Sequence, residues 1–448
     1  MQKFILIILL ATVFSAVVFA QNTSSKNPKT LEDLMEKVNK IKEEKKGDTK
    51  TKSDNKTANK KPVQKDLTIN KKLIDSSYSR LTESEKQLCK NLPPIPARFV
   101  TGDDAQNFLD KTKDFSMMGF LTNNKKDITP TLLGYLAVYE SVKNKASFIV
   151  TQGEKAKAAF ETNNPSIQFG KNRGKIYVSS NSVVYLPLAE TSFADEVVSA
   201  NYVKGDLKFD TKNCLGVPDY ILTKKRTEQK NVYSLGNNGT LQIKFTNNAL
   251  VDVNGPDLFV FEEGQVEPTK LEISKDGMNW LDVGKISGGT SFVDIGSVVK
   301  PNEYYYYVRL TDLNSQSTVP GADIDAIAAI GAAIKLSLNA EVLFDLGKSV
   351  LKPEGIAAVK KFAADLKVMS KGNITIDGYT DDIGSDEANN KLSLDRAKSV
   401  STILQQELKG AGIFTFSENG KGKLQPVAPN TNEENRKKNR RVEIIIGQ

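Results

Sequence analysis

The stretch GYTDDIGSDEANNKLSLDRAKSV, residues 378–400, decides how the C-terminal part of this 448-residue chain folds. It follows a short apolar run, Ile374–Gly378, and leads into a long segment with helical spacing, Asp386–Lys409. Asp381 therefore falls at the carboxyl end of a strand, where open α/β sheets tend to bind ligands. Arg396 falls about three turns along the helix that follows.

One acid and one base near a helix N-terminus suit a ligand that carries both an ammonium and a carboxylate group. Asp381 would bind the ammonium, and the planar guanidinium of Arg396 would hold the carboxylate through two hydrogen bonds. The free N–H groups after Ser385, the expected N-cap, also favour an anion. The residues alone leave a second interpretation open, in which Asp381 and Arg396 form a structural salt bridge beside a capping loop.

The chain contains no histidine. This excludes Ser-His-Asp and Cys-His nucleophile pairs, histidine bases and histidine metal sites, and with them most hydrolase mechanisms. Catalysis by carboxylates alone, as in glycosidases, is not excluded. The stretch around Asp381 offers no nucleophile–base pair, so we expect it to bind without doing chemistry.

The region that holds this stretch, residues 333–448, alternates strands and helices, which predicts a C-terminal α/β domain with helices on one face of a small sheet. The expected strands are Ala340–Phe344, Ile374–Gly378 and Arg441–Ile446, and the expected helices are Glu354–Met369 and Asp386–Lys409. A turn-rich stretch, Glu418–Pro429, precedes the last strand.

The preceding regions differ in pattern, so the chain is predicted to be multidomain. Residues 171–332 hold short Val-, Ile-, Phe- and Tyr-rich runs between turn residues, which favours a β-sandwich over an outer-membrane barrel with its longer strands. Residues 76–170 look mixed α/β. Their expected elements are helices at Ser84–Leu92, Asp103–Lys113 and Pro130–Lys145, and a strand at Ser147–Thr151.

Residues 1–20 have the pattern of a secretory signal peptide, with Lys3 before an apolar run and Ala20 at the expected cleavage site. The alternative is an uncleaved membrane anchor, although the apolar run is shorter than the roughly 20 residues that a spanning helix needs. No cysteine follows the run, so we do not expect a lipid anchor. Residues 21–75 are rich in Lys, Asn, Thr and Ser and are predicted to be a disordered tether.

The net charge of +8 is concentrated in the predicted tether. Residues 26–72 hold 15 lysines and 8 acidic residues, a net charge of +7, so the rest of the chain is nearly neutral. A solvated charged tether explains this better than a nucleic-acid partner, and we expect none. The two cysteines, Cys89 and Cys214, fit either a disulfide in an oxidising compartment or two separate buried thiols.

Four C-terminal motifs together resemble one family. They are LNAEVLFDLGKSVLKPEG (Leu338–Gly355), the stretch 378–400, GKGKLQPVAPN (Gly420–Asn430) and NRKKNRRVEI (Asn435–Ile444). In content and order they closely resemble the OmpA-like peptidoglycan-binding domain, over about a quarter of the chain. The resemblance implies an α/β sandwich in which Asp381 and Arg396 hold diaminopimelate of the peptidoglycan stem peptide. It also implies that further matching residues shape or flank the site: Thr380, Asn389, Leu392, Ser393, Asn439 and Arg440.

The chain departs from the family pattern at three positions. Tyr379 stands where the family often has His, Ala388 where an aromatic residue is common, and Asn435 where Gly is common. None of these positions belongs to the Asp381–Arg396 pair, so the departures bear on affinity more than on function.

The middle region loosely resembles jelly-roll sandwiches of the discoidin or galactose-binding kind, some of which bind a glycan or a structural calcium ion. The motifs that carry this resemblance include NGPDLFVFEEG (Asn254–Gly264), ISKDGMNW (Ile273–Trp280) and GADIDAIAAI (Gly321–Ile330). Four acids in these motifs could be calcium ligands, or they could simply form turns and caps: Asp257, Glu262, Asp323 and Asp325. No other cofactor is expected.

Together these features predict an exported protein of the periplasm or outer membrane of a diderm bacterium. It would bind peptidoglycan without covalent chemistry and link it to an outer-membrane or other envelope protein. Two alternatives remain: an adhesin or glycan-binding protein that acts through residues 171–332, and a wall-active glycosidase that uses carboxylates of the same region.

Overall fold

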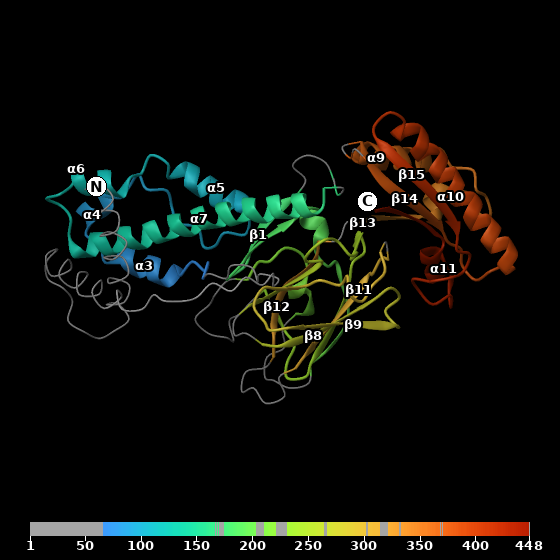
Figure 1. Cartoon of the computed structure of the whole chain (residues 1–448), viewed down its shortest axis with the longest axis horizontal. Coiled ribbons are helices and arrows are strands. Elements are labelled where there is room, and N and C mark those ends of the chain that lie inside the picture. The colour runs from blue at the N-terminus through green and yellow to red at the C-terminus, as the bar shows by residue number, and fades with distance from the viewer. Residues whose placement is uncertain are drawn as a thin grey trace, which may run out of the picture. The chain divides into compact units, whose positions relative to one another are not determined.

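The computed structural model describes residues 66–447, except residues 166, 168, 170–173, 203–209, 221–230, 264–266, 302, 314–320, 331–332, 368 and 370 (Figure 1). The chain divides into two compact units, residues 1–99 with 103–151, and residues 100–102 with 152–448. The predicted signal peptide and most of the predicted tether lie outside the described residues. The end of the tether segment is not irregular, because a helix begins at Lys71.

The first part of the described chain is helical. Its helices are α3 (Lys71–Ser79), α4 (Glu83–Leu88), α5 (Gly102–Lys111), α6 (Met117–Asn123) and α7 (Pro130–Asn163). The strand that we predicted at Ser147–Thr151 is wrong, because α7 runs through it. Leu136, Tyr139, Val142, Ala146 and Ile149 are all buried along α7 at helical spacing, and this long pattern outweighs the β-propensity of five residues. None of the helices in the described residues is both long and apolar enough to cross a bilayer.

A β-sandwich follows, as the turn-punctuated pattern predicts. One sheet has the order β10-β7-β12-β4, and the other has the order β3-β5-β11-β8-β9. The strands are β3 (Glu196–Asn201), β4 (Tyr233–Ser234), β5 (Thr240–Lys244), β7 (Leu258–Glu263), β8 (Thr269–Ser274), β9 (Trp280–Ile286), β10 (Ser291–Val293), β11 (Tyr307–Asp312) and β12 (Asp323–Ala329). A separate hairpin, β1 (Lys175–Val178) with β2 (Val183–Leu186), and two 3-10 turns, η2 (Ala189–Ser192) and η3 (Thr211–Cys214), complete this region.

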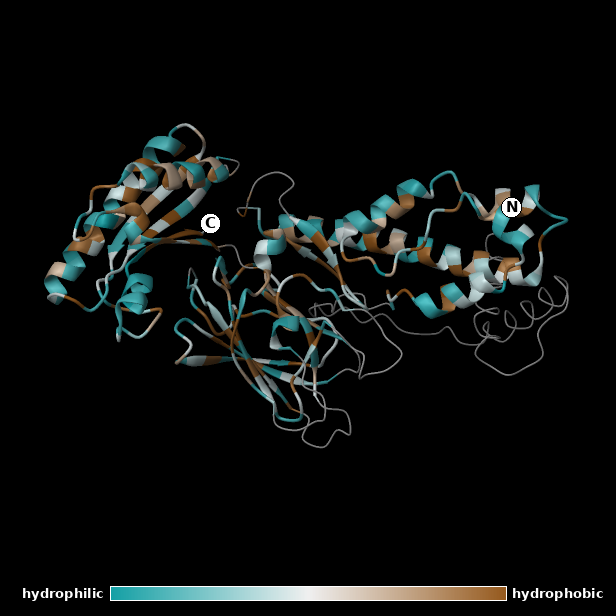
Figure 2. Cartoon of the chain, turned by 180° about the vertical axis from the view of Figure 1, so that it is seen from behind, coloured by the Kyte–Doolittle hydropathy of each residue, from teal (hydrophilic) through white to brown (hydrophobic). Residues whose placement is uncertain are grey.

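Alternating side chains hold the two sheets together. Leu241 and Ile243 of β5 share one core with Val260 of β7 and Ile324 of β12. Figure 2 shows the matching alternation of hydrophobic and hydrophilic residues along the strands. The opposite face of β7 is also buried, because Phe259 and Phe261 belong to a second core. Strand β7 is therefore apolar on both faces, which explains its continuous hydrophobic run.

The C-terminal α/β domain has a five-stranded sheet of order β15-β14-β16-β13-β6. Its elements are β13 (Ala333–Asn339), α8 (Ala340–Leu343), α9 (Pro353–Leu366), β14 (Lys371–Gly378), α10 (Asp386–Leu408), β15 (Ile413–Gly420), α11 (Glu433–Asn439) and β16 (Arg441–Gly447), with β6 (Asn248–Ala249) added from the middle region. Strands β14 and β15 are parallel, and the other pairs are antiparallel. Apolar residues of α9 and α10, such as Val359 and Val400, form one core with Ile376 and Ile444 of the sheet.

Two predictions in this domain need correction. Residues Ala340–Phe344 are not a strand. The side chain of Asn339 accepts a hydrogen bond from the N–H of Glu341 and starts the short helix α8, and the edge strand lies just before it. The predicted turn-rich stretch begins too early, because strand β15 continues to Gly420 before the chain turns.

Cys89 and Cys214 are both buried and unbonded. The structure therefore has two separate thiols rather than the disulfide that we considered. Burial raises the pKa of the Cys89 thiol to about 11 and that of the Cys214 thiol to about 12, so neither is a reactive thiolate at neutral pH.

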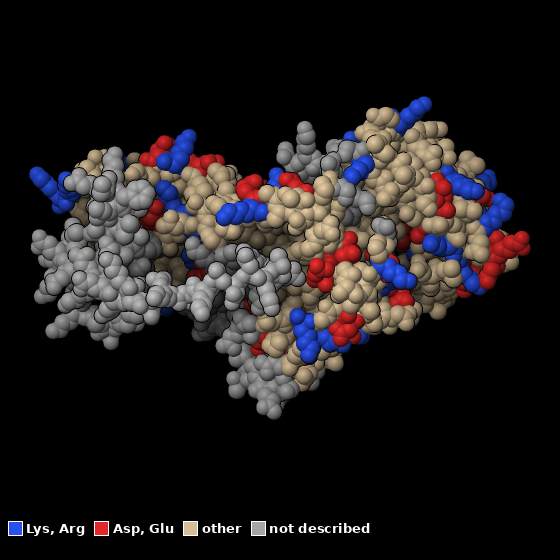
Figure 3. Space-filling view, viewed as in Figure 1, with Lys and Arg blue, Asp and Glu red and all other residues tan. Residues whose placement is uncertain are grey.

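The described surface carries charges of both signs. On the face drawn in Figure 3, Lys and Arg side chains are interspersed with Asp and Glu, and no broad field of one sign covers it. This agrees with the nearly neutral composition that remains once the lysine-rich segment is set aside.

Candidate functional site

The strand that ends at Gly378 lies against helix α10 with almost no space between them. A Cβ atom on Gly378 would stand 2.0 Å from the carbonyl oxygen of Ser393, so only glycine allows this approach. The chain after the strand is then held by the N–H of Thr380, which donates to the carbonyl of Gly422 at 2.8 Å. These contacts fix the backbone on either side of Asp381.

Asp381 is nearly buried, with 7% of its surface exposed. Its Oδ1 accepts a hydrogen bond from the N–H of Ile383 at 3.1 Å, and its Oδ2 pairs with Nη1 of Arg440 at 2.6 Å. The structural ion pair that the sequence left open is therefore present, but its basic partner is Arg440 rather than Arg396. Each carboxylate oxygen keeps a second lone pair, so Asp381 can still accept from a ligand.

Arg440 joins three acids at one point. Besides Asp381, its Nη2 contacts Oε1 of Glu341 at 2.6 Å and Oε1 of Glu433 at 2.5 Å. Burial alone would lower the pKa of the Arg440 guanidinium, but the hydrogen bonds to Asp381, Glu433 and Glu341 outweigh it, and the pKa is raised. Two of these acids also have a second basic partner, since Glu433 pairs with Arg436 at 3.1 Å and Glu341 with Lys437 at 3.6 Å, so the acids and bases around Arg440 are balanced.

Arg396 is also buried, with 3% of its surface exposed, but it is not saturated. Its Nε donates to the carbonyl oxygen of Lys348 at 3.0 Å, and its guanidinium stacks over the ring of Phe344 at 5.2 Å from the ring centroid. Burial and the neighbouring Arg440 lower its pKa, while Asp381 acts in the opposite direction. Within the described residues its two Nη groups have no hydrogen-bond partner, so the fork that binds a carboxylate is available.

The remaining predicted residues take different parts. Thr380 and Asn439 hold the loops: Thr380 Oγ1 donates to the carbonyl of Asp381, and Asn439 Oδ1 accepts from the N–H groups of Val427 and Ala428. The Asn439 side chain is fully used there, so it positions the loop and does not face a ligand. Asn389 differs, because its Nδ2 is buried without an acceptor. Among the described residues, Asn389 Nδ2 and Arg440 Nε are thus two further donors without an acceptor, in addition to the two Nη groups of Arg396.

The family departure at Tyr379 has a structural explanation. The ring of Tyr379 is buried, and the guanidinium of Arg441 stacks on it at 3.7 Å from the ring centroid. Burial first, and the nearby acids Glu443 and Asp377 next, raise the pKa of its hydroxyl. Tyr379 thus supports the sheet beside the site, and its hydroxyl donates to Asp377 and Gln425 rather than to Asp381.

Sequence reasoning missed Glu341 and Glu433, the two other acids on Arg440. Glu341 lies 99 residues from Arg440 in the chain, so no local spacing could have joined them. Glu433 lies seven residues away, in the first turn of α11, where an acid is favoured by the helix dipole in any case. Only the folded structure shows that Glu433 pairs with Arg440 in addition to its favourable place at the helix N-terminus.

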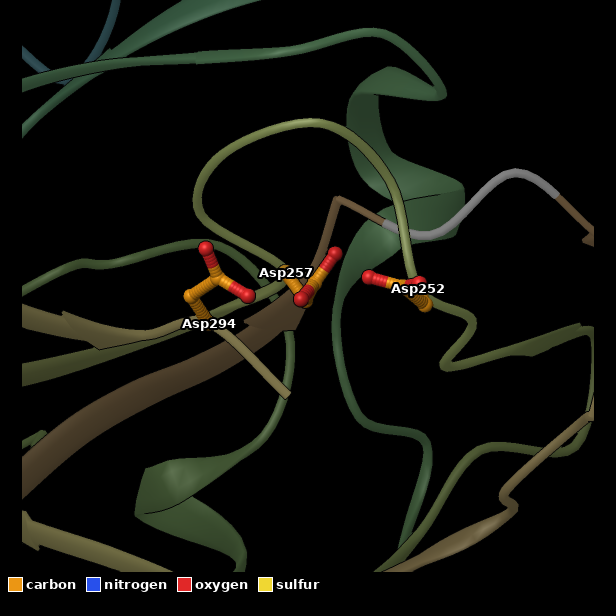
Figure 4. A group of neighbouring side chains, drawn as sticks. All are labelled: Asp252, Asp257 and Asp294. Carbon is orange, nitrogen blue, oxygen red and sulfur yellow. The ribbon is translucent and has the colours of Figure 1, made fainter. Parts of the chain in front are cut away.

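The acids proposed as calcium ligands do not gather into one site. Among the described residues, one group of three acids brings its carboxylate oxygens within 4.8 Å of one another, and it consists of Asp252, Asp257 and Asp294 (Figure 4). Asp257 is the one predicted candidate in it. Its two oxygens accept from the N–H groups of Val253 and Ile295, at 2.7 Å and 2.8 Å. Burial raises the pKa of Asp257 to about 8, so as the structure stands it is mostly protonated at neutral pH.

The other three candidates lie outside that group. Asp325 Oδ1 accepts from the N–H groups of Asp219 and Tyr220, which is the turn-forming role that was the alternative to calcium binding. Glu262 accepts from the N–H of Gly289, and burial raises its pKa to about 9. Asp323 is buried at the start of β12. A structural calcium ion in the sandwich stays a prediction.

Comparison with known proteins identifies the domain around Asp381. The OmpA family model matches residues 343–440, so this part of the chain is an OmpA family domain. The match includes Asp381, Arg396 and Arg440.

Individual relatives agree with the family match. The chain is 42% identical over 114 residues to outer membrane protein A of Bordetella avium. The aligned stretch covers 25% of this chain and 58% of that protein. It is also 35% identical over 120 residues to the peptidoglycan-binding protein ArfA of Mycobacterium bovis. That alignment covers 27% of this chain and 36% of that protein. The chain thus spans less than two thirds of either relative. A crystal structure of the peptidoglycan-associated lipoprotein from Burkholderia pseudomallei aligns with 23% of this chain and 87% of its own, at 28% identity and a TM-score of 0.21.

Proposed function

We propose that the C-terminal domain binds peptidoglycan non-covalently by holding diaminopimelate of the stem peptide between Asp381 and Arg396. The observation that carries this proposal is the unused fork of Arg396, buried beside Asp381 and its ion pair with Arg440. The names of the relatives support it, since one is a peptidoglycan-binding protein and another a peptidoglycan-associated lipoprotein.

The chemistry of the ligand matches the two halves of this centre. Diaminopimelate in the wall carries an ammonium and a carboxylate on the carbon at the end of its side chain. The ammonium would donate to the lone pairs of Asp381 that Ile383 and Arg440 leave unused. The carboxylate would take both Nη groups of Arg396, and Asn389 Nδ2 offers a further donor. Since both partners are nearly buried, their interaction with the ligand is screened less than at an open surface.

The protein as a whole would be a non-catalytic component of the cell envelope. The relatives include outer membrane proteins, which supports a place in the periplasm or at the outer membrane. We propose that the domain holds the chain to the wall and that residues 76–332 meet an outer-membrane or other envelope partner. Peptidoglycan binding itself requires only the C-terminal site.

Sedimentation with purified peptidoglycan tests the proposal. The full chain should pellet with the wall, and Asp381→Asn or Arg396→Lys should each lower the bound fraction about tenfold or more, because each removes one charge-assisted contact. Arg396→Lys keeps the positive charge, so its loss of binding would point to the fork itself.

Lys391→Ala is the matched control on the same helix, because Lys391 is exposed and its ion pair within the described residues is with Asp395. It should bind as the wild type does. Thermal unfolding of each variant separates lost binding from lost folding. Full binding by both site variants would overturn the assignment.

A further inference from the structure

Strand β15 is an unprotected edge of the C-terminal sheet. It pairs with β14 along its whole length, from Ile413 to Gly420, and no strand of the described residues pairs with its other side. Half of its backbone N–H and C=O groups therefore point away from the sheet. Native proteins blunt such edges with a lysine, a proline, a bulge or a very short strand. β15 has eight residues in an unshifted register, and none of them is Lys or Pro.

The first half of this edge is apolar and borders a groove. Ile413 is 79% exposed, and Phe414 and Phe416 are half-buried against the core that α9 and α10 form with the sheet. A groove of about 450 Å³ is lined by these two rings and, at the end of α10, by Leu408 and Lys409. A strand added to β15 would therefore gain backbone hydrogen bonds along the edge and a place for its alternate side chains beside the two rings.

The segment Ile413–Ser417 complements a second copy of itself. It carries no charge, and Phe414 and Phe416 stand on either side of Thr415. In an antiparallel pair centred on Thr415, Phe414 of each copy stands opposite Phe416 of the other, on the face that the helices cover. Aromatic pairs opposite each other on neighbouring strands are favourable, so this register covers the half-buried rings of both copies.

The charges just outside this segment are complementary in the same register. Glu418 of each copy stands opposite Gly412 of the other, and Gly412 lines the groove together with Lys409. Lys409 has no ion-pair partner among the described residues, and Glu418 accepts a hydrogen bond from the Ser401 hydroxyl at 2.5 Å. An acid of one copy would thus approach an unpaired base of the other, twice across the axis. This favours a second copy over an unrelated strand as the occupant of the edge.

We propose that β15 pairs with β15 of a second copy of this chain, antiparallel and across a two-fold axis at Thr415. Such an axis is perpendicular to the sheet, so the two sheets join into one and the helices of both copies cover the same face. Asp381 follows β14, which is parallel to β15, so the two copies of Asp381 lie toward opposite ends of the joined sheet. If the proposed function holds, the pair has two wall-binding sites and binds the wall with increased avidity.

Sedimentation equilibrium of the full chain over a range of concentrations tests the pairing. The wild type should change from monomer to dimer as the concentration rises. Thr415→Lys should weaken the dimer about tenfold or more, because it places two ammonium groups opposite each other on the axis, and Thr415→Glu should do the same with two carboxylates. An equal mixture of the two variants should regain the dimer, because each axis pair then holds one acid and one base.

Thr402→Lys is the matched control, since Thr402 is exposed in the same domain but lies on α10 rather than on the strand edge. It should associate as the wild type does. A wild type that stays monomeric at every concentration would overturn the proposal, and this is the result expected if a strand of another envelope protein occupies the edge. Unchanged association of Thr415→Lys, or a mixture that associates no better than either variant alone, would overturn pairing at Thr415. None of these readouts involves peptidoglycan, so a failure here is distinct from a failure of the proposed function.

Discussion

Arg440 determines which lone pairs of Asp381 remain free to accept a hydrogen bond from a ligand. It occupies one lone pair of Asp381 Oδ2 and holds the carboxylate in a fixed orientation, while Glu341 and Glu433 keep Arg440 in place. In the proposed complex, an ammonium group binds Asp381 without any rearrangement of the acid. Arg396, held through Nε and by stacking on Phe344, is the other half of the proposed centre.

Local spacing was enough to place Asp381 after a strand and Arg396 on the helix that follows, while their pairing as a ligand site came from the family resemblance and stays a prediction. It was not enough to predict that Asp381 pairs with Arg440, 59 residues away. The same limit explains why Asn439 was expected to flank the ligand. Asn439 does lie next to Arg440 as its motif implies, but its side-chain oxygen accepts hydrogen bonds from the backbone N–H groups of Val427 and Ala428.

Glu262 in the sandwich gives a prediction on pH. Burial raises its pKa from 4.5 to about 9, so the folded state keeps a proton that the unfolded state releases above about pH 4.5. The free energy of unfolding from this group is then highest below pH 4.5 and falls as the pH rises toward 9. We expect the wild type to lose at least about 1 kcal/mol between pH 6 and pH 9.

Glu262→Gln cannot ionise and should make that loss smaller, leaving the part that the raised pKa of Asp257 contributes, as measured by urea unfolding at several pH values. Glu196→Gln, at an exposed position on β3 of the same sandwich, should leave the wild-type dependence in place. The same slope in Glu262→Gln as in the wild type would show that Glu262 is ionised in the folded protein.

At the scale of elements, the contact between β14 and α10 sets the geometry of the site. Gly378→Ala would place a methyl group 2.0 Å from the Ser393 carbonyl, so strand and helix would have to separate. We expect a loss of about 2 kcal/mol or more in the free energy of unfolding. Binding of peptidoglycan should fall as well, since Asp381 follows the strand and Arg396 lies on the helix, and the two elements would separate.

Gly372→Ala on the same strand is the control for this change. Its added Cβ would meet a methyl group of Ile446 at 3.3 Å, a side chain that can shift slightly. We expect a cost below about 1 kcal/mol, measured by the same urea unfolding. An equal effect of the two substitutions would contradict the account of the Gly378 contact.

Elements with a long periodic pattern could be predicted, and short ones could not. The apolar stripe of α9, the strand β14 and the helix α10 all lie close to their predicted bounds. Residues 340–343 form one helical turn, too short for any period to distinguish it from a strand. The strand predicted at Ser147–Thr151 is wrong because a five-residue run of β-formers lies inside a 34-residue helix, whose longer pattern determines the structure.

At the scale of the whole molecule, the boundary near residue 332 is not a clean division. Strand β6 of the middle region pairs with β13, and Lys335 of β13 contacts both Glu443 at 3.1 Å and the Tyr306 ring at 4.3 Å from its centroid. Burial lowers the pKa of Lys335, and Glu443 opposes the effect. Composition predicted a change of architecture here but not the shared sheet, because a two-residue strand leaves no pattern in the sequence. Binding experiments therefore belong on the full chain.

The central claim is that one site takes both the ammonium and the carboxylate of a diaminopimelate side chain. Lysine-type peptidoglycan offers the ammonium for Asp381 but no carboxylate for Arg396, so the two wall types differ in the one group that the free fork recognises. The most direct measurement is the bound fraction of the full chain with each purified wall at equal mass. We predict binding to diaminopimelate-type peptidoglycan that is at least about tenfold stronger, with the difference lost in Arg396→Lys. Equal binding of the wild type to both walls would contradict the account.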